Sequence, residues 1–187
     1  VLFGFSLALM VAAELGLDPW DVFHQGLAET LGLRLGVAVV GTSLVVLLLW
    51  IPLRQLPGIG TLANAVAVGV VFEASIAVLP VVERLAPRLG LLAAAVVLNA
   101  IGTGLYIGAG LGPGPRDGLM TGLAARGLPL RVVRTGIEVA VLVVGWLLGG
   151  TVGIGTVVYA LGIGPLVHIT LPLFTIPTAE DPEPVTP

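Results

Sequence analysis

Long apolar runs separated by short polar stretches dominate this chain. Six runs are predicted to be helices, and all but the first approach the length of a membrane span: residues 1–13, 35–53, 59–80, 89–109, 130–148 and 152–173. A helix needs about 20 apolar residues to cross a bilayer. The pattern therefore predicts an all-α membrane protein with six transmembrane helices. The chain starts inside an apolar run and without a methionine, so we expect the first helix to begin before Val1.

Two shorter segments of mixed polarity, 18–31 and 114–127, lie between these runs. The first starts at Asp18-Pro19, which is typical of a helix N-cap and first turn, and stops before Gly32, which is typical of a helix end. The second has a similar start and stop. A helix of about 13 residues reaches only about 20 Å, less than a hydrocarbon core of about 30 Å. We expect two short helices that lie at the membrane interface or re-enter the membrane.

The sequence also repeats itself at a nearly fixed offset. Residues 15–28 match 111–124 at 7 of 14 positions, and residues 32–69 match 127–164 with 14 identities in 38. A shared richness in leucine and glycine does not explain why proline, aspartate and threonine also align. We infer an internal duplication.

The repeat defines the predicted domain organisation. Residues 1–176 form a single transmembrane domain of two repeats, about 1–85 and 86–176, each with three spans and one short helix. Because three crossings are an odd number, the second repeat is expected to be inverted relative to the first, as in many secondary transporters. Residues 177–187, rich in proline and acidic residues, are predicted to be a disordered cytoplasmic tail.

Composition supports the membrane class and narrows the chemistry. The chain is 57% hydrophobic and 10% charged, whereas soluble domains carry about 25% charged residues. The net charge of −3 without a basic run argues against nucleic acid as a partner. Two distant histidines and no cysteine predict no metal site. No dinucleotide fingerprint or nucleophile–base set is visible, so we expect neither a cofactor nor an enzyme.

Arginines in the predicted loops give an expected orientation through the positive-inside rule. With the N-terminus inside, five arginines are cytoplasmic and three are external: Arg54, Arg116, Arg126, Arg131 and Arg134 against Arg34, Arg84 and Arg88. This bias predicts a multi-pass protein with both termini inside.

Ionisable residues within spans are costly and are therefore candidates for function. Glu138 lies in the fifth span, with Arg131 and Arg134 seven and four residues before it on the same helix face. They could line a site for an anionic or zwitterionic solute. Alternatively, Arg134 and Glu138 simply neutralise each other near the interface.

A second candidate is a proton-coupling pair. Glu73 and His168 occupy the same repeat position in the third and sixth spans, so they could face each other and relay protons, as could Glu138. Alternatively, each lies near a helix end and reaches the interface.

The short helices are the third candidate, because half-length helices in equivalent positions point to a transporter binding site. They contribute Asp21, His24, Gln25 and Asp117 as substrate-binding candidates. Helix capping alone also accounts for the two aspartates.

Several motifs carry a resemblance to a known family. They are GLDPWDVFHQGL at 16–27, PGIGT at 57–61, GPGPRDGLM at 112–120, RTGIE at 134–138 and GGTVGIGT at 149–156. With them the chain resembles the YczE/YitT-type family of bacterial integral membrane proteins. The resemblance implies a small multi-pass protein of the bacterial cytoplasmic membrane and assigns no substrate or catalytic residue.

The functional prediction is a small transporter or permease-like protein that moves a small polar or charged solute between inverted repeats. Its expected partners are the lipid bilayer and that solute, and a homo-oligomer is compatible with the sequence. Two alternatives stay open: a substrate-capturing membrane subunit that needs an energising partner, and a non-transporting scaffold or assembly factor. A cavity bordered by Arg134, Glu138 and the short helices would favour transport over a scaffold.

Overall fold

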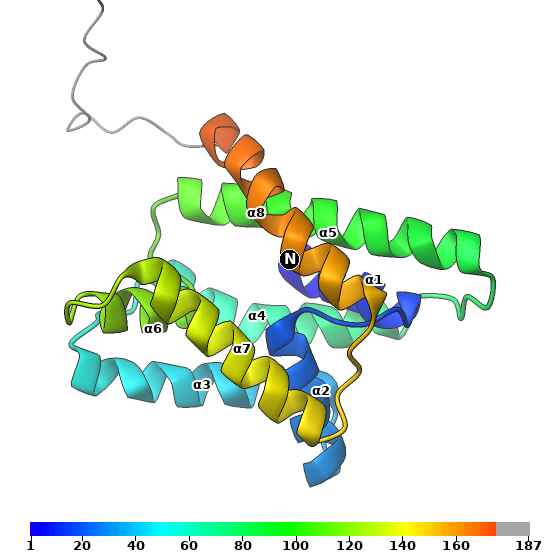
Figure 1. Ribbon diagram of the computed structural model, residues 1–187, viewed down its shortest axis with the longest axis horizontal. Helices are drawn as coiled ribbons and strands as arrows, with labels where there is room; N and C mark the ends of the chain where they lie inside the picture. Colours follow the sequence, from blue (N-terminus) through cyan, green and yellow to red (C-terminus); the bar gives the residue numbers. More distant parts are fainter. Residues whose placement is uncertain (175–187) are drawn as a thin grey trace, which may run out of the picture.

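The computed structural model describes residues 1–174, which form eight helices and no strand (Figure 1). The helices are α1 (Leu2–Ala13), α2 (Pro19–Leu31), α3 (Leu35–Leu53), α4 (Ile59–Ile76), α5 (Leu85–Gly108), α6 (Pro115–Ala124), α7 (Leu130–Leu147) and α8 (Ile154–Phe174). The tail predicted at 177–187 lies outside the described residues.

Every predicted helix forms, but the helices differ in their fitness to cross a membrane. Four of them, α3, α4, α5 and α8, are long and apolar enough to span a bilayer. Helix α1 has 12 residues here, and α7 has 18 but carries Arg131, Arg134 and Glu138. Length and composition therefore identify four of the six predicted spans.

The two short helices form, the first with the start and stop that the residue pattern predicts and the second ending at Ala124, before the predicted stop at Gly127. Asp18 caps α2 because its side chain accepts hydrogen bonds from the backbone N–H groups of Trp20 and Asp21, each at 2.9 Å. Gly32 ends α2 in the left-handed conformation with φ 65°. Helix α6 begins at Pro115 without a side-chain cap. With 13 and 10 residues, neither helix is long enough to span a bilayer.

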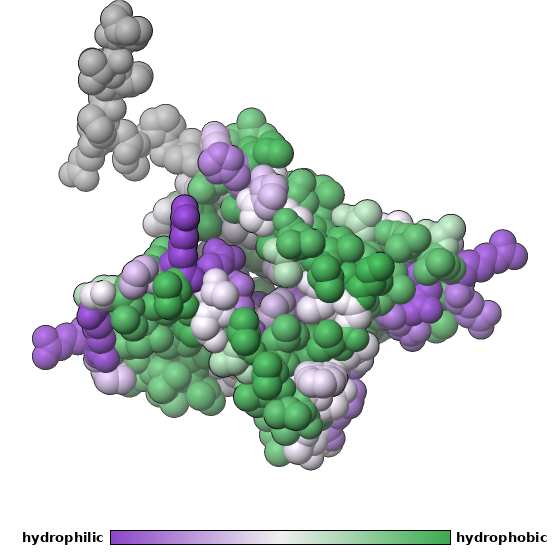
Figure 2. All heavy atoms as spheres, in the orientation of Figure 1, coloured by the Kyte–Doolittle hydropathy of each residue, from purple (hydrophilic) through white to green (hydrophobic). Residues whose placement is uncertain are grey.

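Helix α1 lies at the centre of the bundle, where it packs against α4 and α5, and α5 packs along α8. Buried hydrogen bonds reinforce this core: the Asn99 amide donates to the Ser6 hydroxyl at 3.1 Å, and the Tyr159 hydroxyl donates to Asn99 Oδ1 at 3.2 Å. On the face seen in Figure 2, hydrophilic residues gather at both ends of the long axis, and the surface between them is largely hydrophobic. That distribution suits a bilayer.

Loops of the two predicted repeats contact each other reciprocally. The Gly60 N–H donates to the Leu111 carbonyl at 3.0 Å, and the Gly155 N–H donates to the Leu15 carbonyl at 2.6 Å. These two bonds join residues that correspond in the repeat alignment. Each repeat therefore holds a loop of the other in the same way.

The short helices follow the same exchange, since α2 packs on α7 and α6 packs on α3. Gly26 and Gly145 let the backbones of α2 and α7 approach closely, because an added Cβ at either would overlap the other helix. On the other side, the Trp50 ring fills the space above Gly118, and its indole N–H donates to the Pro115 carbonyl at 3.0 Å.

One pair of contacts differs between the repeats. Helix α3 packs along α4, whereas α7 and α8 make no comparable seam. Between α3 and α4, the backbones of Gly36 and Gly69 touch, and Arg34 forms an ion pair with Glu73. Gly164, the repeat equivalent of Gly69, has no neighbour within 4 Å of an added Cβ. The first seam is closed and the second is open.

Candidate binding cavity

A cavity of about 480 Å³ lies in the middle of the molecule. Its wall includes the first turns of α2 and α6 and residues of α7 and α8. Figure 2 shows hydrophilic residues around a hollow near the centre of the visible face. Sites for small molecules commonly enclose about 300–1,000 Å³, so the cavity has the size of a ligand site.

The α2 side of the cavity holds two buried carboxylates and an arginine from α6. The Arg116 guanidinium lies 3.9 Å from Asp18 Oδ1 and 3.6 Å from Asp21 Oδ1. It also lies over the Trp20 ring, 5.3 Å from the ring centroid, in a cation–π contact. Arg116 therefore joins the first turns of the two short helices.

The Asp18–Asp21 pair shares this one cation. Burial, followed by the neighbouring Asp21 charge, raises the pKa of Asp18 to about 7, against the opposing effect of Arg116. Burial also raises the pKa of Asp21. Two carboxylates beside one guanidinium therefore favour the retention of a proton near neutral pH.

His24 and Gln25 of α2 support the site rather than line it. His24 Nδ1 lies 3.0 Å from Asp21 Oδ1, at hydrogen-bond distance, and the His24 side chain is fully buried. Burial lowers the pKa of His24 to about 3, so its ring is neutral. Gln25 Oε1 accepts the Thr151 N–H at 2.8 Å and so ties α2 to the loop before α8.

The α6 side of the cavity presents Asp117. No hydrogen bond or ion pair joins its carboxylate to any residue within 1–174. A Cβ built on Gly114 would lie 3.3 Å from Asp117 Oδ2 and 2.9 Å from the Tyr106 hydroxyl, so both groups face the start of α6. Burial raises the pKa of Asp117, opposed by Arg134 and Arg116.

On α7, Arg134 and Glu138 border the cavity and also pair with each other. Arg134 Nε donates to Glu138 Oε1 at 3.0 Å. The two readings of these residues are thus compatible: a neutralising pair can be part of a polar lining. Arg131 is exposed and does not line the cavity.

Two polar groups of the cavity wall have no partner in the described part of the chain. They are the indole N–H of Trp20, whose side chain is 5% exposed, and the hydroxyl of Tyr106. Buried donors are nearly always satisfied by protein, water or ligand. Both atoms are themselves buried, with less than 1 Å² of exposed surface each, in residues that line the cavity.

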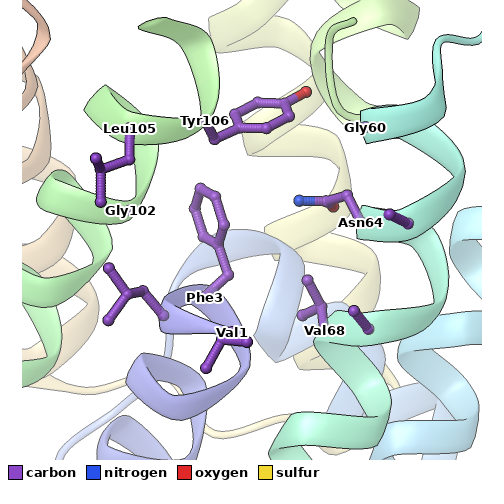
Figure 3. Close-up of a pocket in the computed structure, with 11 residues that line it drawn as sticks. Val1, Phe3, Gly60, Asn64, Val68, Gly102, Leu105 and Tyr106 are labelled. Atoms are coloured by element: carbon purple, nitrogen blue, oxygen red, sulfur yellow. The ribbon is translucent and has the colours of Figure 1, made fainter. Parts of the chain in front are cut away.

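An apolar pocket of about 340 Å³ adjoins the charged cavity. Figure 3 shows Phe3, Asn64 and Tyr106 directed toward one another, and these residues line both spaces. Phe3 and Tyr106 meet edge to face, with ring centroids 6.0 Å apart. They form a partition between the polar centre and the apolar pocket.

The predicted proton-coupling residues lie elsewhere and apart. Glu73 pairs with Arg34 and accepts the Gly36 N–H at 2.9 Å, which fastens α4 to α3. His168 lies on an exposed face of α8. The repeat alignment placed these two residues at equivalent positions, but equivalence does not bring them into contact.

The residues predicted from the sequence do not include Asp18, Trp20, Tyr106 or Arg116, which all line the cavity. Arg116 counts there as a loop arginine, although it aligns with Trp20 at the start of a short helix, and that position is the available signal. Arg116 and Arg134 both line the cavity. The remaining loop arginines number three on each side (Arg54, Arg126 and Arg131 against Arg34, Arg84 and Arg88). The arginine count thus no longer favours one orientation.

Comparison with known proteins gives relatives along most of the chain. The model of a family of unknown function, DUF6198, matches residues 1–172. A Haemophilus influenzae protein named "Uncharacterized protein" is 37% identical over 169 residues, which are 90% of this chain and 78% of that protein. The Bacillus subtilis "Uncharacterized membrane protein YczE" is 36% identical over 172 residues, 91% of this chain and 80% of that protein. No solved structure matches.

Proposed function

The chain belongs to the DUF6198 family and is an integral membrane protein of the YczE type, and we propose that it is a small transporter. In this proposal a small polar or charged solute moves through the central cavity. The observation that carries the proposal is that the first turns of both short helices border one polar cavity, together with Arg134 and Glu138. Half-length helices that meet at a central site are typical of secondary transporters.

The proposed architecture is six spans arranged as two inverted repeats. Helices α1 and α7 complete the four apolar spans, and α2 and α6 are the re-entrant pair. The reciprocal bonds of Gly60 with Leu111 and of Gly155 with Leu15 support this arrangement, because a pseudo-two-fold axis produces such matched pairs. The proposed location is the bacterial cytoplasmic membrane, and six spans would place both termini on the same side.

The two seams have a proposed role in alternating access, in which a transporter opens its cavity to one side of the membrane at a time. The seam between α3 and α4 is closed by the contact of Gly36 with Gly69 and by the ion pair of Arg34 with Glu73. The equivalent seam between α7 and α8 is open, and residues of both helices line the cavity. In an inverted-repeat protein, an exchange of the two seams would expose the cavity to the other side of the membrane.

The cavity also bears on the alternatives. A scaffold has no need of a polar space of about 480 Å³ bordered by charged residues, so we place transport ahead of a scaffold. A substrate-capturing subunit would use the same cavity and would fail to move solute without its partner. We propose no catalytic role.

Site-directed labelling tests the access proposal, and the natural absence of cysteine makes it direct. Ala160 on α8 lines the cavity, whereas its repeat equivalent Ala65 on α4 is 1% exposed. In proteoliposomes, a membrane-impermeant maleimide should label Ala160→Cys from one side only and leave Ala65→Cys unlabelled. Labelling of Ala160→Cys from neither side would contradict the proposal.

Solute movement is the second part of this test. The purified protein in liposomes should give solute-driven currents on a solid-supported membrane when a panel of small amines, carboxylates and phosphates is applied. A current from one class shows transport by the chain alone. Binding without any current would favour the substrate-capturing alternative.

A further inference from the structure

The cavity has an imbalance of charge. Four carboxylates line it, and two guanidinium groups accompany them: Asp18, Asp21, Asp117 and Glu138 with Arg116 and Arg134. Arg116 serves both Asp18 and Asp21, and Arg134 pairs with Glu138. Buried carboxylates without a compensating partner are unfavourable. Even when the Asp18–Asp21 pair retains one proton, the carboxylates outnumber the two guanidinium groups by one, so the wall has room for positive charge and disfavours a purely anionic solute.

The two repeats identify which carboxylate is free. Asp21 and Asp117 are repeat equivalents in the first turns of α2 and α6. Asp21 lies at hydrogen-bond distance from His24, three residues later, and near Arg116. The residue three positions after Asp117 is Met120, whose side chain has no N–H or O–H group to donate. The first carboxylate thus has close partners in the protein, whereas Arg134 and Arg116 act on the second only from beyond ion-pair distance and leave room for another partner.

A second, independent feature is the pair of unused donors. The Trp20 indole N–H and the Tyr106 hydroxyl lie in the cavity wall and have no partner within 1–174. A simple alkylammonium ion offers no acceptor to them. A molecule that satisfies both the carboxylate and the donors carries a positive charge and an acceptor oxygen or nitrogen.

We propose that the cavity binds a small organic cation, an amine with a hydrogen-bond acceptor, whose ammonium group pairs with the Asp117 carboxylate. This inference rests on the proposed function, because it names the class of solute for the same cavity. In this proposal the buried Trp20 N–H and Tyr106 O–H groups turn slightly toward the cavity when the ligand binds and donate to its acceptor. Arg116 stays paired with Asp18 and Asp21, and Arg134 stays paired with Glu138. These pairs limit the electrostatic repulsion between the carboxylates of the wall.

Binding by the detergent-purified full chain tests this inference with three probes of similar size. The probes are 2-aminoethanol (an ammonium with an acceptor), n-propylamine (an ammonium alone) and glycolate (an anion with a hydroxyl). Ligands that bind the folded state raise its unfolding temperature. We expect stabilisation to decrease from 2-aminoethanol to n-propylamine, and none with glycolate. Stabilisation by glycolate alone, or by no amine, would overturn the assignment.

Variants of Asp117 test the residue. Asp117→Asn should weaken 2-aminoethanol binding by about tenfold or more, because hydrogen bonds to charged groups are among the stronger ones. Glu83→Gln, an exposed loop residue, should leave the affinity unchanged. Unchanged affinity in Asp117→Asn would remove this carboxylate from the site.

A further variant keeps the carboxylate and changes its partner. Met120→His would give Asp117 the same internal donor that His24 gives Asp21, and should also weaken amine binding. It provides the test if Asp117→Asn does not fold, and unaltered binding in it would count against the free carboxylate. Transport of an anion with no binding of amines would overturn the ligand class and leave the transporter proposal standing. Amine binding without transport would support the ligand class and overturn the transporter proposal.

Discussion

The two predicted repeats contain the same helices in the same order, yet the seam between α3 and α4 in the first is closed, whereas the equivalent seam between α7 and α8 in the second is open. In the first, Asp18 caps α2, Asp21 lies against His24, and α3 is fastened to α4. In the second, α6 starts without a side-chain cap and Asp117 is unpaired within the described residues. The two predicted repeats thus share a backbone arrangement and both line the cavity, and they differ in how closely the carboxylates of their short helices are paired.

The largest effect on stability is expected where the short helices pack on the long ones, α2 on α7 and α6 on α3. Gly145→Leu would place a side chain where the Phe23 backbone lies, which should expel α2 from α7. Overpacking of this kind costs about 3 kcal/mol at the upper end of its usual range. The free energy of unfolding in detergent should fall by at least this amount.

A matched control lies in the same helix. Gly136 has no neighbour within 4 Å of an added Cβ. Gly136→Ala should therefore change stability by less than about 1 kcal/mol, the difference in helix propensity. Equal losses of stability in the two variants would contradict the close packing of α2 on α7 at Gly145.

The two short helices also differ at their N-caps, because the Asp18 side chain caps α2 and no side chain caps α6. Asp18→Ala should lower the free energy of unfolding by about 2 kcal/mol, the upper range for an N-cap, because it also deprives Arg116 of one carboxylate. Asp18→Asn keeps the capping oxygen and should recover part of the loss. Thermal unfolding of both variants checks this prediction, and identical losses would show that the cap contributes nothing.

A smaller effect is expected on the α6 side. Trp50→Phe removes the indole N–H that donates to the Pro115 carbonyl and shortens the ring whose far edge packs on Gly118. The free energy of unfolding should fall by about 1 kcal/mol for the hydrogen bond, with a further loss for the ring contact. A loss of stability as large as that of Gly145→Leu would mean that both short helices depend on the same kind of close packing.

The smallest effect on stability is expected at the closed seam between α3 and α4. A change there nevertheless tests the difference between the two seams most directly. Glu73→Gln removes a pair whose arginine is 75% exposed, and such pairs contribute less than about 1 kcal/mol. The substitution should nevertheless raise the rate at which maleimide labels Ala65→Cys, because the seam loses its ion pair. An unchanged rate would mean that the glycine contact alone holds the seam.

Much of the fold could be predicted because it depends on local patterns. Span length, the Asp18-Pro19 start and the Gly32 stop act within a few residues, and the eight helices form as expected. Helix α7 was harder to classify, because Arg131, Arg134 and Glu138 interrupt its apolar character. The cavity beside α7 accounts for Arg134 and Glu138, which line it, but not for Arg131, which is exposed.

The site was less predictable because its contacts join distant residues. Arg116 reaches Asp18 and Asp21 from another helix, and a count of loop charges could not reveal that contact. Glu73 and His168 align in the repeats, but a pseudo-two-fold axis relates equivalent positions without making them neighbours. Trp20 and Arg116, which also align, do meet. Only the packing distinguishes the two cases.

The reciprocal loop contacts carry a consequence for the origin of this protein. A chain of one repeat would have no partner for its own Gly58-Ile59-Gly60 or Leu15-Gly16 segment, since each finds its partner in the other half. It would reach the same contacts only by pairing with a second copy. Under the inverted topology that we propose, this copy would insert the opposite way, so the ancestor would be a dual-topology homodimer whose joined genes hold one copy in each orientation.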